Sequence, residues 1–329
     1  MDFIFDAITN WIKDLFIGVI EGNLTNMFTD VNEKVGTIAE QAGQTPQGWN
    51  SGVFDMIQSL SETVILPIAG LVITYVLCFE LISMVTEKNN LHDIDTWMFF
   101  KYVFKAFVAV LLVSNVFNIT MAIFDVGQHL VTQASGVIGS DTAIDIEEAL
   151  ATMMDTLEDM GVAELLLLVV ETFLVSLCMK IMSVLITVIL YGRMIEIYLT
   201  CSLAPIPSAT LTNKEAGGMG ENYLRGLCAL GVQGFLILVC VGIYAALVND
   251  MVVADNLHTA IFSVAAYTVI LCVSLFKTGT LAKSIFNAHL GQEGEIQPFT
   301  KDTTSFMPIR RGDTGRKGSA ARQKTTIRP

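Results

Sequence analysis

The chain has 329 residues, of which 53% are hydrophobic and only 16% charged, and its formal net charge is −13. This composition excludes an ordinary soluble globular protein and is typical of a polytopic membrane protein. A segment inside the bilayer must satisfy its backbone hydrogen bonds internally, so we expect an all-α fold. Membrane-spanning helices would form it, together with amphipathic helices at the membrane surface.

The N-terminal region, residues 1–63, is predicted to form extracytoplasmic amphipathic helices and a linker. Its first twenty residues lack a basic start, a clean apolar stretch and a small-residue cleavage site, so we do not expect a signal peptide. Apolar residues recur there at helical spacing: Ile4, Ile8, Trp11, Ile12, Leu15, Phe16 and Val19. The pattern indicates a helix that lies at a membrane surface or against the bundle. The turn-rich residues 42–52 would form the linker.

A transmembrane bundle is predicted over residues 64–285. Its apolar runs approach or exceed the roughly 20 residues that a helix needs to cross the bilayer. They lie at about 64–85, 97–118, 164–191, 223–248 and 259–278. The third run carries Glu171 and Lys180, so a break near Lys180 into two shorter helices is an alternative. A sixth apolar stretch, 195–211, contains two prolines, and the topology depends on whether it crosses.

The distribution of charge predicts the topology, because Lys and Arg near the ends of spans prefer the cytoplasm. Residues 1–63, 119–163 and 249–258 hold 19 of the 32 acidic residues but only two of the 19 basic ones. These stretches should therefore face outward, with the N-terminus outside and the basic C-terminus inside. Five spans satisfy this pattern, whereas a sixth across 195–211 would invert everything that follows it.

The stretch 195–211 is then predicted to be re-entrant or interfacial on the cytoplasmic side. Pro205 and Pro207 remove two donors and disfavour helix at the residues before them, which predicts an extended conformation from Ala204 to Pro207. Such backbone is stable at membrane depth only where protein or a watery cavity covers it. The alternative is a simple kinked helix end.

Two regions outside the spans have a distinctive pattern. Residues 140–161 carry Ile146, Leu150, Met153, Leu157 and Met160 at helical spacing, with acidic residues between them. This predicts an outer amphipathic helix that serves as a lid on the bundle or as a docking surface. Residues 286–329 are predicted to form a disordered cytoplasmic tail, because 301–329 hold eight basic and two acidic residues. The tail would touch anionic lipid, or alternatively a soluble partner or nucleic acid.

Charged residues within spans are costly and usually face a bundle interior or a wet path. Glu80 and Lys105 lie at similar depth on consecutive antiparallel helices, so we expect them to form an ion pair. Glu171 and Lys180 are nine residues apart, on opposite faces of one helix. Each therefore needs its own partner or water, which suits an oligomer or a channel wall.

Motifs for catalysis are not found in the sequence. It has no phosphate-binding glycine loop, dinucleotide fingerprint or paired-His zinc motif. The four histidines are scattered, and the six cysteines lie singly in apolar stretches, where packing explains them. We therefore expect no enzyme activity, no cofactor and no metal.

The run "YGRMIEIYLTCSLAPIPSATL", residues 191–211, resembles the TrbL-like family of polytopic inner-membrane subunits of conjugative type IV secretion systems. It looks most like the branch on mobile elements of Gram-positive bacteria. The residues that carry the resemblance are Arg193, Glu196, Ala204, Pro205, Ile206 and Pro207, followed by "GGMGENYLRG" at 217–226. In that family no residue is catalytic. Arg193 and Glu196, neighbours at i and i+3, would anchor the re-entrant segment, and the two prolines would shape it.

The resemblance implies a channel or scaffold subunit in the bacterial cytoplasmic membrane that helps to move DNA or protein across it. Its partners would be other secretion subunits, including cytoplasmic ATPases, further copies of itself and membrane lipids, with transient contact to transferring DNA. One alternative is a small secondary transporter or channel with a broken helix at its site. Against it, no inverted repeat is visible in the sequence. A plain membrane scaffold is a third interpretation.

Overall fold

The computed structural model describes residues 2–87, 96–138, 151–213 without 152 and 155, 217–252 and 257–286. Regular structure in these ranges is helical throughout. The helices are α1 (Asp2–Ala42), α2 (Pro46–Trp49), α3 (Ser51–Leu60), the π-helical turn η1 (Ser61–Ile65), α4 (Leu66–Glu87), α5 (Thr96–Ser114), α6 (Val116–Ile138), α8 (Val162–Ser202), α9 (Pro205–Ser208), α10 (Gly217–Val252) and α11 (Leu257–Ile285). The chain divides into two units, 1–290 and 291–329, and the second lies outside the described residues, as does nearly all of the predicted tail.

Five helical segments are long and apolar enough to cross a membrane, as the sequence predicts. They are Ser51–Thr86, Trp97–Ser114, Val162–Ser202, Gly217–Asp250 and Leu257–Ile285. The first joins α3, η1 and α4 into one continuous rod. The prediction of an all-α polytopic membrane protein is therefore confirmed.

Helix α8 is a single unbroken helix of 41 residues. The alternative of a break near Lys180 is therefore wrong, since apolar residues continue at helical spacing on both sides of that lysine. At 1.5 Å per residue the helix is about 60 Å long, roughly twice the hydrocarbon thickness of a bilayer. It also contains residues 195–202, which were predicted to belong to a separate segment, so the break in the chain begins only after Ser202.

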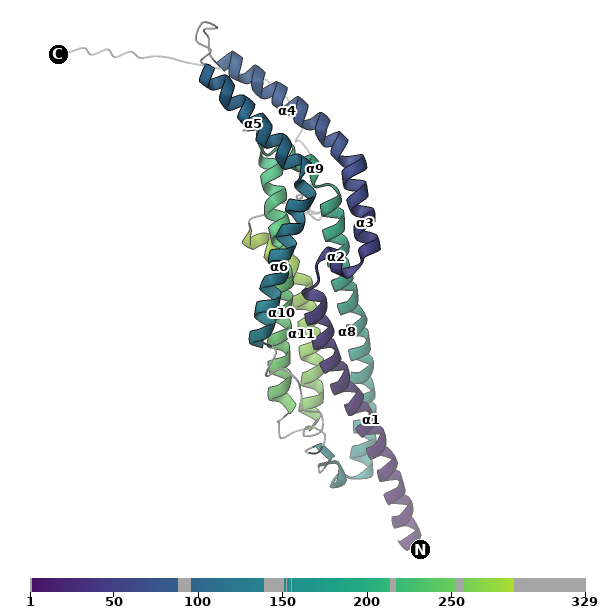
Figure 1. The fold of residues 1–329 in the computed structure, drawn as a ribbon. Helices are drawn as coiled ribbons and strands as arrows, with labels where there is room; N and C mark the ends of the chain where they lie inside the picture. Colours follow the sequence, from purple (N-terminus) through teal and green to yellow (C-terminus); the bar gives the residue numbers. More distant parts are fainter. Residues whose placement is uncertain are drawn as a thin grey trace, which may run out of the picture. The chain divides into compact units, whose positions relative to one another are not determined.

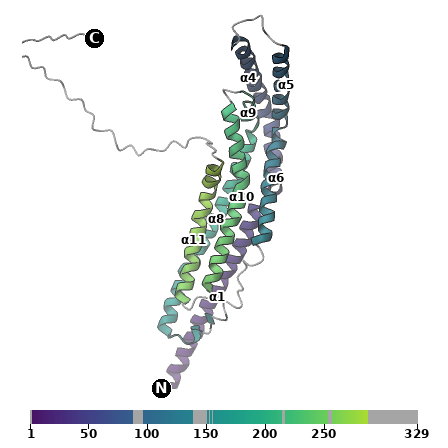
Figure 2. The ribbon, with the colours of Figure 1, turned by 90° about the vertical axis from the view of Figure 1, so that its left-hand side faces the viewer.

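The core of the bundle is formed by α8, α10 and α11, with α1 and α6 packed beside them (Figure 1). Hydrogen bonds fix the helix directions. Asn23 of α1 donates to Thr172 of α8 at 3.2 Å, and Ala42, at the end of α1, accepts from Arg193 further along α8, so α1 and α8 are parallel. Helix α10 runs antiparallel to its neighbour α11, and the view in Figure 2 places α6 and α11 on opposite sides of α10.

Helix α1 continues far beyond the twenty residues for which the sequence predicts a helix. From Ile20 onward it packs against the bundle, and Leu24, Phe28 and Ile38 are completely buried. The earlier apolar residues are exposed, with Trp11 at 65%. Of the two interpretations of this region, packing against the bundle therefore describes the second half of α1.

Helix α6 is an element that the sequence analysis missed. The second span was expected to continue to residue 118, but α5 ends at Ser114 and a turn at Asn115 leads into α6. The missed helix falls in the 119–163 stretch that was expected to lie outside the membrane. Its buried stripe includes Gly127 and Thr120. Polar residues such as Asp125, Gln128 and Gln133 interrupt its apolar ones, so the sequence shows no long apolar run, although the helix packs tightly on α10.

The helices α4 and α5 form an antiparallel hairpin whose small residues meet α9. Ala69 and Ile73 of α4 pack with Ala109 and Val113 of α5, and Ala209 completes this cluster. In the predicted outer helix, residues 140–150 lie outside the described part of the chain, whereas Met153 and Leu157 are helical and buried in the core with α1 and α8.

Candidate functional site at the proline motif

The proline motif follows the end of α8 and is helical rather than extended. Ala204 has φ −47° and ψ −41°, and residues 205–208 form the short helix α9. The predicted extended conformation from Ala204 to Pro207 is therefore wrong. Pro205 and Pro207 stand in the first turn of α9, where backbone N–H groups have no partner within a helix, so the missing donors have little cost.

The motif is buried and joins the end of α8 to the α4–α5 hairpin. Ala204 and Ala209 are completely buried, and Pro205 and Ser208 are buried beside them. Ala209 contacts Ala69 and Ala109 of the hairpin, where only a small side chain fits between two helices. The segment is thus covered by protein, as irregular backbone at membrane depth must be.

The turn after α9 leads directly into α10. Thr210 donates its hydroxyl to the carbonyl of Pro207 at 2.8 Å and accepts from the backbone N–H of Gly220 at 3.2 Å. A Cβ atom on Gly220 would lie 2.6 Å from the carbonyl oxygen of Pro207. This close approach explains a glycine in the "GGMGENYLRG" run and fixes the start of α10 against the motif.

Arg193 lies buried about three helical turns before the motif, at the C-terminal end of α1. Its Nη1 lies 3.5 Å from the carbonyl oxygen of Ala42, the last residue of α1. The last carbonyls of a helix carry partial negative charge and lack partners within the helix, so a guanidinium is stabilised there. Arg193 therefore links α8 to α1.

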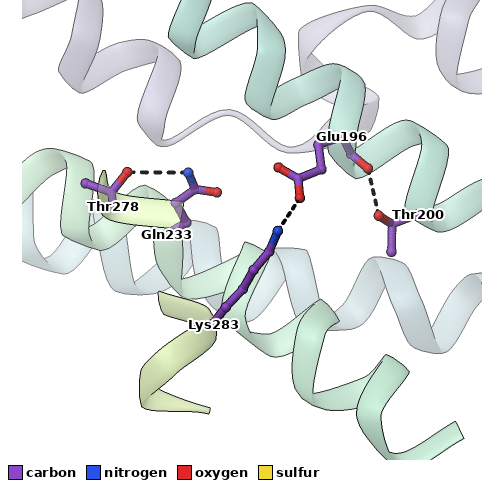
Figure 3. Close-up of polar contacts among 5 residues, drawn as sticks. All are labelled: Glu196, Thr200, Gln233, Thr278 and Lys283. Carbon is purple, nitrogen blue, oxygen red and sulfur yellow. Dashed lines mark hydrogen bonds and ion pairs between the residues drawn. The ribbon is translucent and has the colours of Figure 1, made fainter. Parts of the chain in front are cut away.

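Glu196 points from α8 toward α11 (Figure 3). Its carboxylate accepts a hydrogen bond from Lys283 Nζ at 2.7 Å, and its backbone carbonyl accepts one from the hydroxyl of Thr200 at 2.8 Å. Nearby, Gln233 of α10 donates to Thr278 of α11 at 3.4 Å. The motif residues Arg193 and Glu196 thus bind two different helices on two sides of α8.

Aromatic residues hold the linker against the same part of α8. The Tyr198 hydroxyl donates to the carbonyl of Pro46 at 2.6 Å. The Trp49 ring meets Tyr191 edge-on at 5.2 Å between centroids and lies 5.8 Å from Tyr198. The sequence predicts residues 42–52 only as a linker. A tryptophan in this otherwise polar stretch is the single feature that indicates a contact with α8.

Among the other charges in the spans, Lys105 donates to Glu80, so the structure contains the ion pair predicted between the first two spans.

Glu171 of α8 has its Oε2 2.6 Å from Nδ1 of His258 at the start of α11, a partner that the sequence did not predict. Lys180 is exposed on α8, and within the described residues no ion pair involves it. Glu171 and Lys180 thus have different surroundings, as opposite helix faces require.

These contacts make the end of α8 a junction at which α1, α2, α4, α5, α9, α10 and α11 meet. Its polar groups bind helices to one another. Such a junction can hold the relative positions of the spans.

The fold and this junction define a multi-pass α-helical protein of the cytoplasmic membrane. The family model described as "TrbL/VirB6 plasmid conjugal transfer like protein" matches residues 31–205, which include Arg193, Glu196, Ala204 and Pro205. The match covers more than half of the chain, and the chain belongs to this family of structural components of conjugal transfer systems. Comparisons with curated proteins and with solved structures give no match. Family membership implies association with other conjugal transfer components.

Proposed function

We propose that the protein is an integral channel or scaffold subunit of a conjugative type IV secretion system, and that it helps to move DNA or protein across the cytoplasmic membrane. The observation that carries the proposal is the match to the TrbL/VirB6-like family over residues 31–205 in a chain with five candidate spans. The described residues of the proline motif pack against other helices, which supports a structural role.

The proposed orientation has the N-terminus outside and the C-terminus inside. Helices α4 and α8 end, and α5 and α10 begin, toward one end of the bundle, whereas α6 and α10 end, and α8 and α11 begin, toward the other end (Figure 1). Residues 88–95 and 203–216 hold Lys88 and Lys214, residues 301–329 hold eight basic residues, and residues 139–161 and 253–256 hold none, a distribution that favours the cytoplasm for the first set of segments and the tail. Cytoplasmic ATPases would therefore meet the first set, and the basic tail would contact anionic lipid or a partner.

Self-association is part of the proposal. Lys180 stands among exposed apolar residues of α8, between Leu177 and Val184, and a charge at that depth calls for protein, water or the membrane surface. Contact with another subunit would satisfy it. A particle of several copies after detergent extraction would support this part of the proposal, and a monomeric particle would contradict it.

The test of function is deletion of the gene in a donor cell, followed by measurement of transfer frequency. Transfer should be lost on deletion and restored by the wild-type gene. Transfer at the normal frequency without the gene would contradict the proposal. Crosslinking of the transferring strand to the protein tests DNA contact separately.

A matched pair of variants tests, in the same transfer assay, whether the contacts at the end of α8 are needed for transfer. Glu196→Lys should reduce transfer, because it places two cations together, and Glu196→Lys with Lys283→Glu should restore it. The alternative of a secondary transporter is weakened by α8, α10 and α11, each of which runs unbroken. Uptake of a small solute by the purified protein in vesicles would favour that alternative.

A further inference from the structure

The bundle has two sides of opposite character. On α8 and α11 most outward side chains are apolar, including Val184, Val188, Ile270 and Phe276, each at least half exposed, with Lys180 and Lys277 exposed among them. On α1 the exposed side chains from Glu21 onward are polar, including Glu21, Glu33 and Glu40, whereas on α6 exposed polar residues such as Asp125, Gln128 and Gln133 alternate with apolar ones. The exposed large apolar residues on this side are Ile119, Val126, Leu130 and Val137 of α6, so the second half of α1 supplies most of its polar character.

Helices α1 and α6 lie next to each other on α10. Val131 of α6 lies close to Gly43 at the end of α1, and Ala42, Arg193 and Val131 all surround Gly234 of α10. A Cβ atom on Gly127 of α6 would be 2.6 Å from the carbonyl oxygen of Gly231, so α6 and α10 are in backbone contact. The outward faces of α1 and α6, which we call the α1/α6 face, are therefore one continuous side of the bundle.

The α1/α6 face is at the same depth as the apolar side. Asn23 of α1 is level with Thr172 of α8, and His258 of α11 is level with the adjacent Glu171. Counting along the helices, Glu33 and Thr37 lie about 15 and 21 Å beyond this level, and Ile270 lies about 18 Å beyond it. Carboxylates of α1 thus stand opposite the middle of the apolar spans.

Lipid is not a suitable environment for this face, because charged side chains at membrane depth face water or protein. Glu21, Glu33, Glu40 and Asp125 take part in no ion pair among the described residues. The charged residues of α1 between Glu21 and Ala42 are four acidic ones, Glu21, Asp30, Glu33 and Glu40, and one basic one, Lys34, while α6 carries Asp125 and His129, so the net charge of this face is negative. Two copies that met through this face would bring like charges together at a cost, so water suits it better than a second copy.

We propose that the α1/α6 face is the wall of a water-filled passage through the membrane. The proposal rests on the proposed function, since it names the side of a channel subunit that the passage would use. The wall is electronegative, so it concentrates cationic groups and repels phosphate. A transferring strand would therefore not run bare along these two helices.

The test uses single cysteines in the full chain, in sealed membrane vesicles from cells that make the whole transfer system. Thr37→Cys on α1 and Gln133→Cys on α6 report on the wall without removing a charge. Ile270→Cys on α11 and Val188→Cys on α8 are controls at similar depth on the apolar side. Each variant is treated with membrane-impermeant methanethiosulfonate reagents, one cationic and one anionic. Intact mass counts the added labels above those of the parent with its six cysteines.

The expected result is one added label at Thr37→Cys and at Gln133→Cys, and none at the two controls. The cationic reagent should react roughly tenfold faster than the anionic one at the wall, and high salt should reduce the difference. Protection of both wall cysteines would overturn the proposal, and a disulfide between copies at these positions would replace it with a subunit interface. Equal labelling of wall and control positions would also overturn it.

Failure of this proposal and failure of the proposed function give different results. If the wall cysteines are labelled but deletion of the gene leaves transfer unchanged, the water-filled passage is supported and the role in conjugation is rejected. If deletion abolishes transfer but the wall cysteines are not labelled, the role in conjugation is supported and the α1/α6 face is rejected as the wall of the passage.

Discussion

At the residue scale, the pair of Glu80 and Lys105 gives a charge-reversal prediction. Glu80→Lys should lower the amount of correctly assembled protein, because two cations would then face each other between α4 and α5. Glu80→Lys with Lys105→Glu should restore it, since the pair is rebuilt in the opposite sense. The measurement is the yield of monodisperse protein after mild detergent extraction. No recovery in the double variant would show that the ion pair does not hold the hairpin.

Also at the residue scale, Gly127→Ala should destabilise the bundle, whereas Gly136→Ala should not. Both glycines are in α6, but only Gly127 meets backbone, the carbonyl of Gly231, while a Cβ at Gly136 meets nothing within 4 Å. Overpacking at a close contact costs about 1–3 kcal/mol, and Ala in place of an exposed helical Gly stabilises by about 1 kcal/mol. Thermal unfolding in detergent compares them, and equal melting temperatures would contradict the close contact of α6 with α10.

At the element scale, α9 packs between α8 and the α4–α5 hairpin and sets the distance between them. Ala209→Leu should destabilise the protein by about 1–3 kcal/mol, because the larger side chain must enter the cluster with Ala69 and Ala109. Leu203→Ala is the control, since Leu203 is half exposed on the same segment. Protease resistance of α4–α5 in membranes measures the effect, and an unchanged cleavage pattern in Ala209→Leu would refute this role of α9.

The elements differ in how far the sequence could predict them. The five spans and the Glu80 and Lys105 pair could be predicted, because they depend on local hydropathy and on depth along consecutive helices. Glu196 and Lys283 are 87 residues apart, and their contact depends on which helices are neighbours. The periodicity of the sequence carries no information on which helices are neighbours. The rule that the residue before a proline avoids the α region also failed at α9, because Ala204 is α-helical before Pro205, and both prolines stand in the first turn of the helix, where their missing donors cost little.

At the scale of the whole molecule, the proposed orientation predicts the activity of fusions. Alkaline phosphatase, which folds only outside the cytoplasm, should be active when fused after residue 145 and inactive when fused after residue 329. A fluorescent protein that folds only in the cytoplasm should give the opposite result at the same two positions. Activity of the phosphatase at residue 329 would reverse the orientation and place the basic tail outside.

The position of α1 has a consequence for the synthesis of the protein. Its buried residues, such as Leu24 and Phe28, pack against side chains of α8, α10 and α11 that come much later in the chain. At about 5–20 residues per second, a ribosome needs roughly 10–40 s to go from the end of α1 to the end of α10. During that interval the apolar stripe of α1 has no helix to cover it, and the membrane–water interface is the surface available. The N-terminal helix is thus a surface helix in the nascent chain and a bundle helix in the finished one.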